Sequence, residues 1–238
     1  MNIAFTTSLF GDRGNNPAIF RKSKKYDYFL FGDKNQDDLR TSWNVINISD
    51  HKSVRHLKCN IKKSRYSKFF SHKLLKKKYD IIYYCDAHWS PKINVDWINL
   101  SSKILQNNFA LAQDLHPNAF HDGRSIVDEM RGILSRSKDS IHRLNLTQQF
   151  LSEKYPKVAL DKKTKFYENT IFGYSPLDKN YNSIVDEFWG YYSNVEMSYR
   201  DQPFWNVLLR QKSLQPLHLS LKNFFEKTGA YGNHTYIE

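Results

Sequence analysis

The strongest chemical signal in the 238-residue chain is a short apolar segment that ends in polar residues. Residues 79–88 read Tyr-Asp-Ile-Ile-Tyr-Tyr-Cys-Asp-Ala-His. Residues 80–84 are apolar enough for a buried strand, which would place Asp86 and His88 beyond its carboxyl end, where α/β sheets bind ligands. A carboxylate there can hold Mg²⁺ or Mn²⁺ against a diphosphate. An Asp after a strand also commonly forms a turn or caps a helix, so the motif alone does not identify the chemistry.

A basic segment precedes this strand. Residues 52–78 contain eleven Lys and Arg residues and no Asp or Glu, which makes this stretch a main source of the net charge of +12. Arg65, Lys68 and His72 are three or four residues apart and would share one face of a helix over residues 61–78. That face could contact a diphosphate, or it could be a solvated basic surface.

Two further carboxylates are candidates for acid–base chemistry. Asp201 lies in Arg-Asp-Gln, residues 200–202, between two predicted helices, and Glu168 precedes a predicted strand. A carboxylate at a helix start is usually a cap, but it can also take a proton from an acceptor hydroxyl. Glu168 is either a turn carboxylate or a group that contacts the acceptor. His116, which precedes Pro117, is either a loop residue or part of a site. Spacing does not separate these alternatives.

The elements that must position these residues alternate in the first half of the chain. Strands are predicted over residues 3–8, 26–31, 43–48, 80–84, 109–111 and 170–174, and helices over residues 61–78, 93–106, 125–137, 141–154, 183–197 and 203–211. Alternating strands and helices favour an α/β fold with a mainly parallel central sheet and helices on both faces. We expect one domain over residues 1–238, with a loop from Gly229 onward.

Composition bounds the environment of the chain. Hydrophobic residues make up 40% of it, which is enough for a packed core. The basic excess favours anionic partners. Two cysteines without metal-site spacing predict no disulfide framework and a reducing compartment. The N-terminus lacks the pattern of a signal peptide, and no apolar run approaches the ~20 residues of a membrane span, so we expect a cytoplasmic protein without a membrane span.

The order of these segments resembles a known family. It is similar to the A-type-fold (GT-A, Rossmann-like) nucleotide-sugar glycosyltransferases of large algal viruses of the chlorovirus type, which are related to plant mucilage and pollen-turgor glycosyltransferases. Each matching stretch is short, but together they follow the order of the family over nearly the whole chain: residues 5–11, 26–33, 42–45, 65–75, 79–88, 116–129, 166–172 and 200–202.

The resemblance implies a role for several residues. Thr6, Thr7 and Ser8 would line the base and ribose of the donor, and Arg65 and Lys68 would face its diphosphate. The acidic metal motif of the family falls on Asp86, but its second Asp is replaced by His88, which could ligate the metal in its place. Asp201 would be the catalytic base, with Glu168 as a second catalytic candidate. His234 in the C-terminal tail is either a third metal ligand or an incidental residue.

These expectations define one preferred function and two alternatives. The preferred function is a Mn²⁺- or Mg²⁺-dependent, inverting glycosyltransferase that moves a hexose or pentose from a nucleotide-diphosphate donor, expected to be a UDP-sugar, to a glycan hydroxyl. Residues 1–115 would bind the donor and residues 116–238 the acceptor, and no nucleic acid is expected as a partner. The alternatives are a nucleic-acid-binding protein, which the charge of +12 suggests, and a glycan-binding domain that lost its catalytic chemistry.

Overall fold

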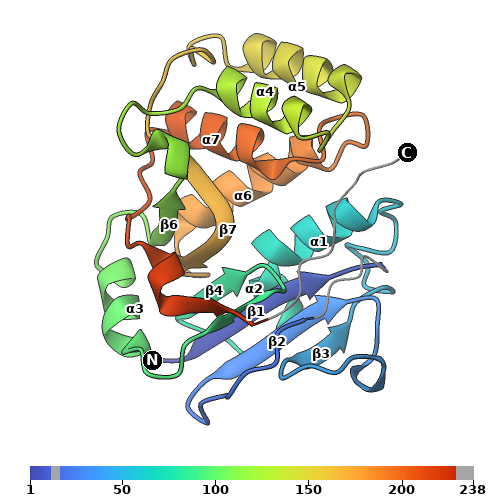
Figure 1. Ribbon diagram of the computed structural model, residues 1–238, viewed down its shortest axis with the longest axis vertical. Helices are drawn as coiled ribbons and strands as arrows, with labels where there is room; N and C mark the ends of the chain where they lie inside the picture. Colours follow the sequence, from blue (N-terminus) through green and yellow to red (C-terminus); the bar gives the residue numbers. More distant parts are fainter. Residues whose placement is uncertain (12–16, 229–238) are drawn as a thin grey trace.

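The computed structural model describes residues 1–11 and 17–228. A six-stranded sheet with the order β3-β2-β1-β4-β7-β6 forms its centre (Figure 1). The strands are β1 (Ile3–Leu9), β2 (Asp27–Gly32), β3 (Asn44–Asn47), β4 (Ile81–Cys85), β6 (Leu111–Leu115) and β7 (Tyr167–Tyr174). β7 pairs antiparallel with both β4 and β6, whereas β1, β2, β3 and β4 pair in parallel. The predicted α/β class with a mainly parallel sheet is therefore confirmed.

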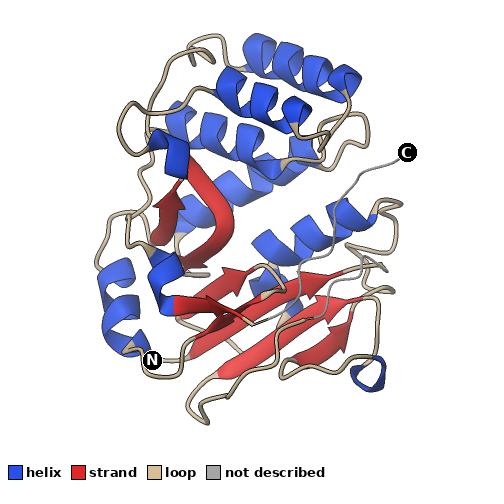
Figure 2. Ribbon diagram, viewed as in Figure 1, coloured by secondary structure: helices blue, strands red, loops and turns tan. Residues whose placement is uncertain are grey.

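Helices cover both faces of this sheet, as Figure 2 shows. The helices are α1 (Asn60–Phe69), α2 (Ser71–Leu74), α3 (Trp97–Leu105), α4 (Ile126–Ser135), α5 (Ile141–Lys154), α6 (Lys179–Tyr192) and α7 (Asp201–Gln211). One hydrophobic cluster joins the sheet to α1, α6 and α7, and α4 and α5 extend it outward. A second cluster packs α3 against the opposite face, and β8 (Phe225–Lys227) closes it by pairing with β5 (Trp89–Pro91).

Alternation along β1 explains why the sheet has two cores. Phe5 faces the second cluster, where it stacks on Tyr28 and Tyr83 with ring centroids 5.2 Å and 5.4 Å apart. Ala4, one residue earlier, faces the first cluster. A strand buried on both faces loses the polar alternation of a half-exposed strand, so these segments read as nearly continuous apolar runs.

The predicted helix over residues 61–78 is shorter in the structure. α1 ends at Phe69, and α2 is a single turn before the chain leaves the helix at Leu75. The Ser71 hydroxyl donates to the carbonyl of Ser67 at 2.6 Å and also approaches Thr6 Oγ1 at 3.1 Å. This serine therefore ties the helix break to β1.

Other predicted boundaries are also corrected. β6 spans residues 111–115 rather than 109–111, and β7 begins at Tyr167 rather than at residue 170. α6 spans residues 179–192 rather than 183–197, and α7 begins at Asp201 rather than at residue 203. Within the described part of the chain, no helix has the length and apolar character needed to cross a membrane. The predicted loop from Gly229 onward and His234 lie outside the described residues.

Candidate active site

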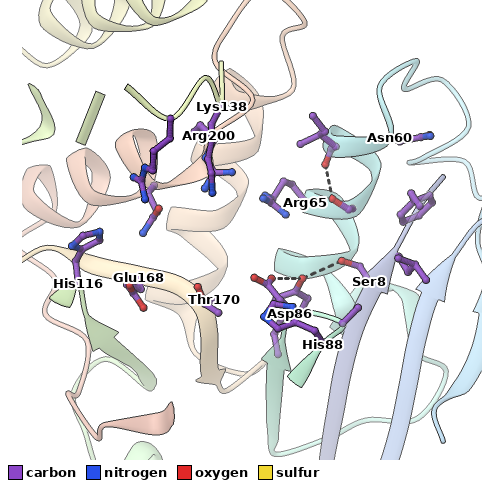
Figure 3. A pocket seen from close by; sticks show the side chains of 18 residues that line it. Ser8, Asn60, Arg65, Asp86, His88, His116, Lys138, Glu168, Thr170 and Arg200 are labelled. Carbon is purple, nitrogen blue, oxygen red and sulfur yellow. Dashed lines mark hydrogen bonds between the residues drawn. The ribbon is translucent and has the colours of Figure 1, made fainter. Parts of the chain in front are cut away.

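A pocket of about 250 Å³ opens where the carboxyl ends of β1 and β4 meet the start of β7 (Figure 3). Because β7 runs antiparallel to both β4 and β6, its first residues lie at the same edge of the sheet as the last residues of those two strands. The Asp86 amide donates to the carbonyl of Thr170 at 3.1 Å and joins the two sides of this edge. The lining residues are Ser8, Leu9, Phe10, Asn60, Ile61, Ser64, Arg65, Tyr84, Asp86, Ala87, His88, His116, Arg136, Lys138, Glu168, Thr170, Arg200 and Gln202.

Asp86 follows the tip of β4, and its side chain is 33% exposed to the pocket. The Tyr84 hydroxyl donates to Asp86 Oδ1 at 3.2 Å, and Ser8 Oγ lies 3.1 Å from the same hydroxyl. Burial, and then the charge of Asp86, raise the pKa of Tyr84, which keeps the phenol protonated as a donor. Lys68 Nζ lies 3.7 Å from Asp86 Oδ1 on the buried side. The carboxylate is therefore held in place from behind and open in front.

Asp201 is buried, with a side chain that is only 3% exposed, and it does not line the pocket. Its carboxylate lies 3.3 Å from Arg65 Nε and 3.4 Å from Lys68 Nζ. Burial alone would raise the pKa of Asp201, but the charges of Arg65 and Lys68 outweigh burial and lower it well below its usual range. This carboxylate is ion-paired in the core and does not line the pocket, so its placement gives no support to the prediction that Asp201 is the catalytic base.

A chain of side-chain amides also holds the Asp201 carboxylate. Asn169 Nδ2 donates to Asp201 Oδ2 at 3.1 Å, and Gln113 Nε2 donates to Asn169 Oδ1 at 2.8 Å. The indole of Trp205 donates to Gln113 Oε1 at 2.9 Å. Each group has a defined partner, so this buried network links β6, β7 and α7 beneath the pocket.

The residues predicted to bind the donor divide into two groups. Ser8 and Arg65 line the pocket, but Thr6, Thr7 and Lys68 are buried outside it. The Thr6 hydroxyl donates to the carbonyl of Tyr83 at 3.4 Å, and Thr7 Oγ1 has no hydrogen-bond partner within the part of the chain that the structure describes. Thr6 and Thr7 are therefore core residues of β1, and only the last polar residue of that strand reaches the pocket. Lys68 does not line the pocket, but its Nζ lies 3.7 Å from Asp86 Oδ1.

The basic segment before β4 is not one solvated face. Lys62 is fully buried and donates to the carbonyls of Tyr192 at 2.5 Å and Ser198 at 3.1 Å. Lys62 therefore ties α1 to the chain that leads into α7. Other cations of the segment, such as Lys76 and Lys78, are exposed.

Glu168 and His116 line the side of the pocket away from Asp86 (Figure 3). Glu168 Oε2 pairs with Lys222 Nζ. Burial and the nearby charge of Arg124 lower the pKa of His116 to about 4, so its ring is neutral near pH 7. His116 Nδ1 accepts from the Asn118 amide at 3.2 Å. Both predicted candidates on this side are thus accessible to a ligand in the pocket.

Arg136, Lys138 and Arg200 also line the pocket. Arg200 belongs to the Arg-Asp-Gln segment that the sequence singled out, but Arg136 and Lys138 were not predicted. They lie in the turn between α4 and α5. The local sequence of a turn does not show whether its Lys and Arg side chains line a pocket or face open solvent. Only the packing of α4 on α7 brings this turn to the pocket.

The two predicted metal ligands fit a divalent cation in part. Asp86 and His88 line the same wall and offer one oxygen and one nitrogen, a set that Mn²⁺ accepts. Within residues 1–11 and 17–228, no group of three or more His, Cys, Asp or Glu side chains is arranged to hold a metal. Two protein ligands suffice where the oxygens of a bound diphosphate complete the coordination. The residues present are therefore compatible with a divalent cation whose coordination a bound diphosphate completes.

Comparison with known proteins gives little beyond this geometry. No protein-family model matches the chain, and no curated protein matches it. Among solved structures, the apo form of mouse xyloside xylosyltransferase 1 is similar with a TM-score of 0.46 and 10% sequence identity, over 93% of this chain and 86% of that chain. A likeness this weak assigns neither a family nor an activity. The resemblance to the algal-virus glycosyltransferases therefore rests on the sequence segments alone.

Proposed function

We propose that this chain is a glycosyltransferase that takes a sugar from a nucleotide-diphosphate donor, with a UDP-sugar as the first candidate, and transfers it to a glycan hydroxyl. One observation carries the proposal. Asp86 stands at the tip of β4, open to a pocket whose walls also carry Arg65, Arg136, Lys138 and Arg200. A carboxylate among several cations suits a ligand with negative charge and an associated cation.

In this proposal the donor binds along the wall formed by β1, α1 and β4. Asp86 and His88 would hold Mn²⁺ or Mg²⁺, which would neutralise the diphosphate as it leaves. Arg65 lines this wall and would contact the same diphosphate, while Asp201 and Lys68 hold Arg65 and Asp86 in position from the core. Asp201 is then a positioning residue, because its carboxylate contacts those side chains instead of the substrate.

The acceptor would enter from the side of β7. Glu168 replaces Asp201 as the proposed base because Glu168 lines the pocket. Asp114 accepts hydrogen bonds from the backbone amides of Leu221 and Lys222, which fixes the segment that carries the partner of Glu168. A base on the wall opposite Asp86 suits attack on the face of the sugar opposite the leaving diphosphate, and therefore inversion at the anomeric carbon.

A nucleotide panel tests this proposal. The protein is mixed with UDP, GDP and ADP, each with and without Mn²⁺, and its melting temperature is measured. We expect one nucleotide to raise the melting temperature and to do so mainly with Mn²⁺, because a ligand that binds only the folded state stabilises it. The matching nucleotide-sugar should then undergo slow metal-dependent hydrolysis. No stabilisation by any nucleotide, together with salt-sensitive binding of an oligonucleotide, would favour a nucleic-acid-binding protein instead.

A further inference from the structure

Three cations form one wall of the pocket, opposite the wall of Asp86. Arg136 follows the last residue of α4, Lys138 comes two residues later, and Arg200 immediately precedes α7. Figure 3 shows the side chains of Lys138 and Arg200 close together above Glu168 and Thr170, on the far side of the pocket from Asp86 and His88. We refer to Arg136, Lys138 and Arg200 as the cation wall.

No carboxylate of the described residues forms an ion pair with the cation wall. The two carboxylates that line the pocket already have partners, since Asp86 lies 3.7 Å from Lys68 and Glu168 pairs with Lys222. The nearby buried carboxylate of Glu129 lies 3.0 Å from Arg124. Glu129 and Asp201 offset part of the charge of Arg136 and Arg200 at longer range, but among the described residues the cation wall has no carboxylate as a direct partner.

The mutual repulsion within the cation wall is visible in Lys138. Burial, followed by the charges of Arg200 and Arg136, lowers the pKa of Lys138. Arg200 Nε is buried and has no hydrogen-bond partner among residues 1–11 and 17–228. Like charges gathered without a directly paired counter-ion cost free energy that a bound anion would partly recover. An unsatisfied donor in the same wall gives that anion a hydrogen-bond partner.

The backbone holds the cation wall in a fixed turn. Ser137, between Arg136 and Lys138, has a φ of 49° in the left-handed region. The Ser137 amide donates to the carbonyl of Leu134 at 2.9 Å, and the Lys138 amide donates to that of Ile133 at 3.1 Å. This is a Schellman closure of α4, made with serine where glycine is usual. Arg200 is held in a comparable way, because its amide donates to Ser198 Oγ at 3.0 Å.

We infer that the cation wall binds an anionic group of the acceptor, so that the acceptor is a phosphorylated or carboxylate-bearing sugar. The inference rests on the proposed function. A donor diphosphate on the opposite wall would already be neutralised by its divalent cation and by Arg65. The charge of the cation wall then remains for a second anion, and its place beside Glu168 puts that anion next to the proposed base.

The test measures binding of three sugars to the protein saturated with UDP and Mn²⁺. Isothermal titration is carried out with glucose 6-phosphate, glucuronic acid and glucose, on the wild type and on Lys138→Gln, Arg200→Gln and the control Lys76→Gln. Lys76 is an exposed cation outside the pocket. UDP affinity is measured with Mn²⁺ for each variant, which also shows that the variant is folded.

We expect at least one anionic sugar to bind the wild type and glucose not to bind. Lys138→Gln and Arg200→Gln should weaken that binding about 10-fold or more, as expected when a charge-assisted hydrogen bond is lost, and Lys76→Gln should not. The sugar that binds more tightly identifies phosphate or carboxylate as the recognised group. UDP affinity should stay within about twofold of the wild type in all three variants.

Other outcomes separate this inference from the proposed function. Equal binding of glucose, or unchanged binding of the anionic sugar by both pocket variants, would overturn the inference. An equal loss of UDP affinity in those variants would also overturn it, because the cation wall would then serve the diphosphate, while the proposed function would stand. Binding of an anionic sugar by a protein that binds no nucleotide would overturn the proposed function.

Discussion

Replacing Asp201 with asparagine separates a positioning role from a catalytic one. The substitution keeps the size of the side chain and removes the negative charge between Arg65 and Lys68, at 3.3 Å and 3.4 Å. Both cations then stay buried, and among the described residues Lys68 keeps Asp86, at 3.7 Å, as its one ion-pair partner. We expect Asp201→Asn to destabilise the fold strongly, whereas a substrate-contacting base could be removed at little cost in stability.

The size of this loss follows from burial. Removing one partner of a buried ion pair typically costs about 3–5 kcal/mol, because the other charge stays uncompensated. Lys68 could also lose its proton, which at pH 7 would cost about 5 kcal/mol from an ordinary pKa of about 10.4. Lys68 therefore contributes at most this much to the loss in unfolding free energy. Loss of a negative charge at the start of α7 adds about 0.3–1 kcal/mol. A total of about 4 kcal/mol is therefore expected.

The assay is urea unfolding of the wild type and the variant between pH 3 and pH 8. The folded-state pKa of Asp201 is depressed, so its stabilisation is fully present above the unfolded-state pKa of about 4 and declines as pH falls below it. The gap in unfolding free energy between the two proteins should therefore shrink as pH falls from 5 toward 3.

The matched control is Asp186→Asn. Asp186 pairs with Lys73 at 2.8 Å, but both side chains are largely exposed, so its loss should cost less than about 1 kcal/mol. A similarly small cost for Asp201→Asn would refute the reasoning. If Asp201→Asn lost turnover while its unfolding free energy stayed unchanged, Asp201 would be the catalytic base after all.

Three further substitutions test the fold. Gly173→Ala should cost about 1–3 kcal/mol in urea unfolding, because a Cβ would lie 2.6 Å from the ring of Tyr83, which is stacked in the core; an unchanged midpoint would contradict this packing. Ser137→Gly should raise the unfolding free energy by about 0.5–1 kcal/mol by relieving the left-handed backbone, and a loss of stability would contradict that strain. Burial lowers the pKa of Lys62 to about 7, so between pH 7 and pH 10 the unfolded chain binds more protons at Lys62 than the folded protein does. The unfolding free energy of the wild type relative to Lys62→Met should therefore rise over that range. A difference that falls with pH would contradict the lowered pKa of Lys62.

Local apolar pattern was sufficient to predict most of the sheet. β1, β2 and β4 are short apolar runs that end in turn residues, and each forms a strand close to its predicted range. β6 was misplaced because Gln113 and Asp114 interrupt its apolar run. Both side chains are buried, and their hydrogen-bond partners include Trp205 and Leu221, about a hundred residues further along the chain. A local sequence pattern cannot predict hydrogen bonds to such distant residues. The direction of β7 also depends on neighbours instead of local sequence.

The candidate site was predictable only where strand ends supply it. Asp86 and Ser8 follow from the rule that ligands bind at the carboxyl ends of strands, and both line the pocket. Thr6 has the same residue character as Ser8 but lies two residues deeper, where it completes hydrogen bonds of the core. The cation wall comes from two turns far apart in sequence, so only the packing of α4 on α7 brings it together.

The central claim is that Asp86 holds a divalent cation against a donor diphosphate. Its most direct test is calorimetric titration of UDP into the wild type and Asp86→Asn, each with and without Mn²⁺. We expect Mn²⁺ to tighten UDP binding to the wild type by about tenfold or more, and we expect Asp86→Asn to lose this gain while keeping the metal-independent part of the affinity. The role of Asp86 would be contradicted if Mn²⁺ did not change the UDP affinity of the wild type, or if Mn²⁺ tightened UDP binding to Asp86→Asn as much as to the wild type.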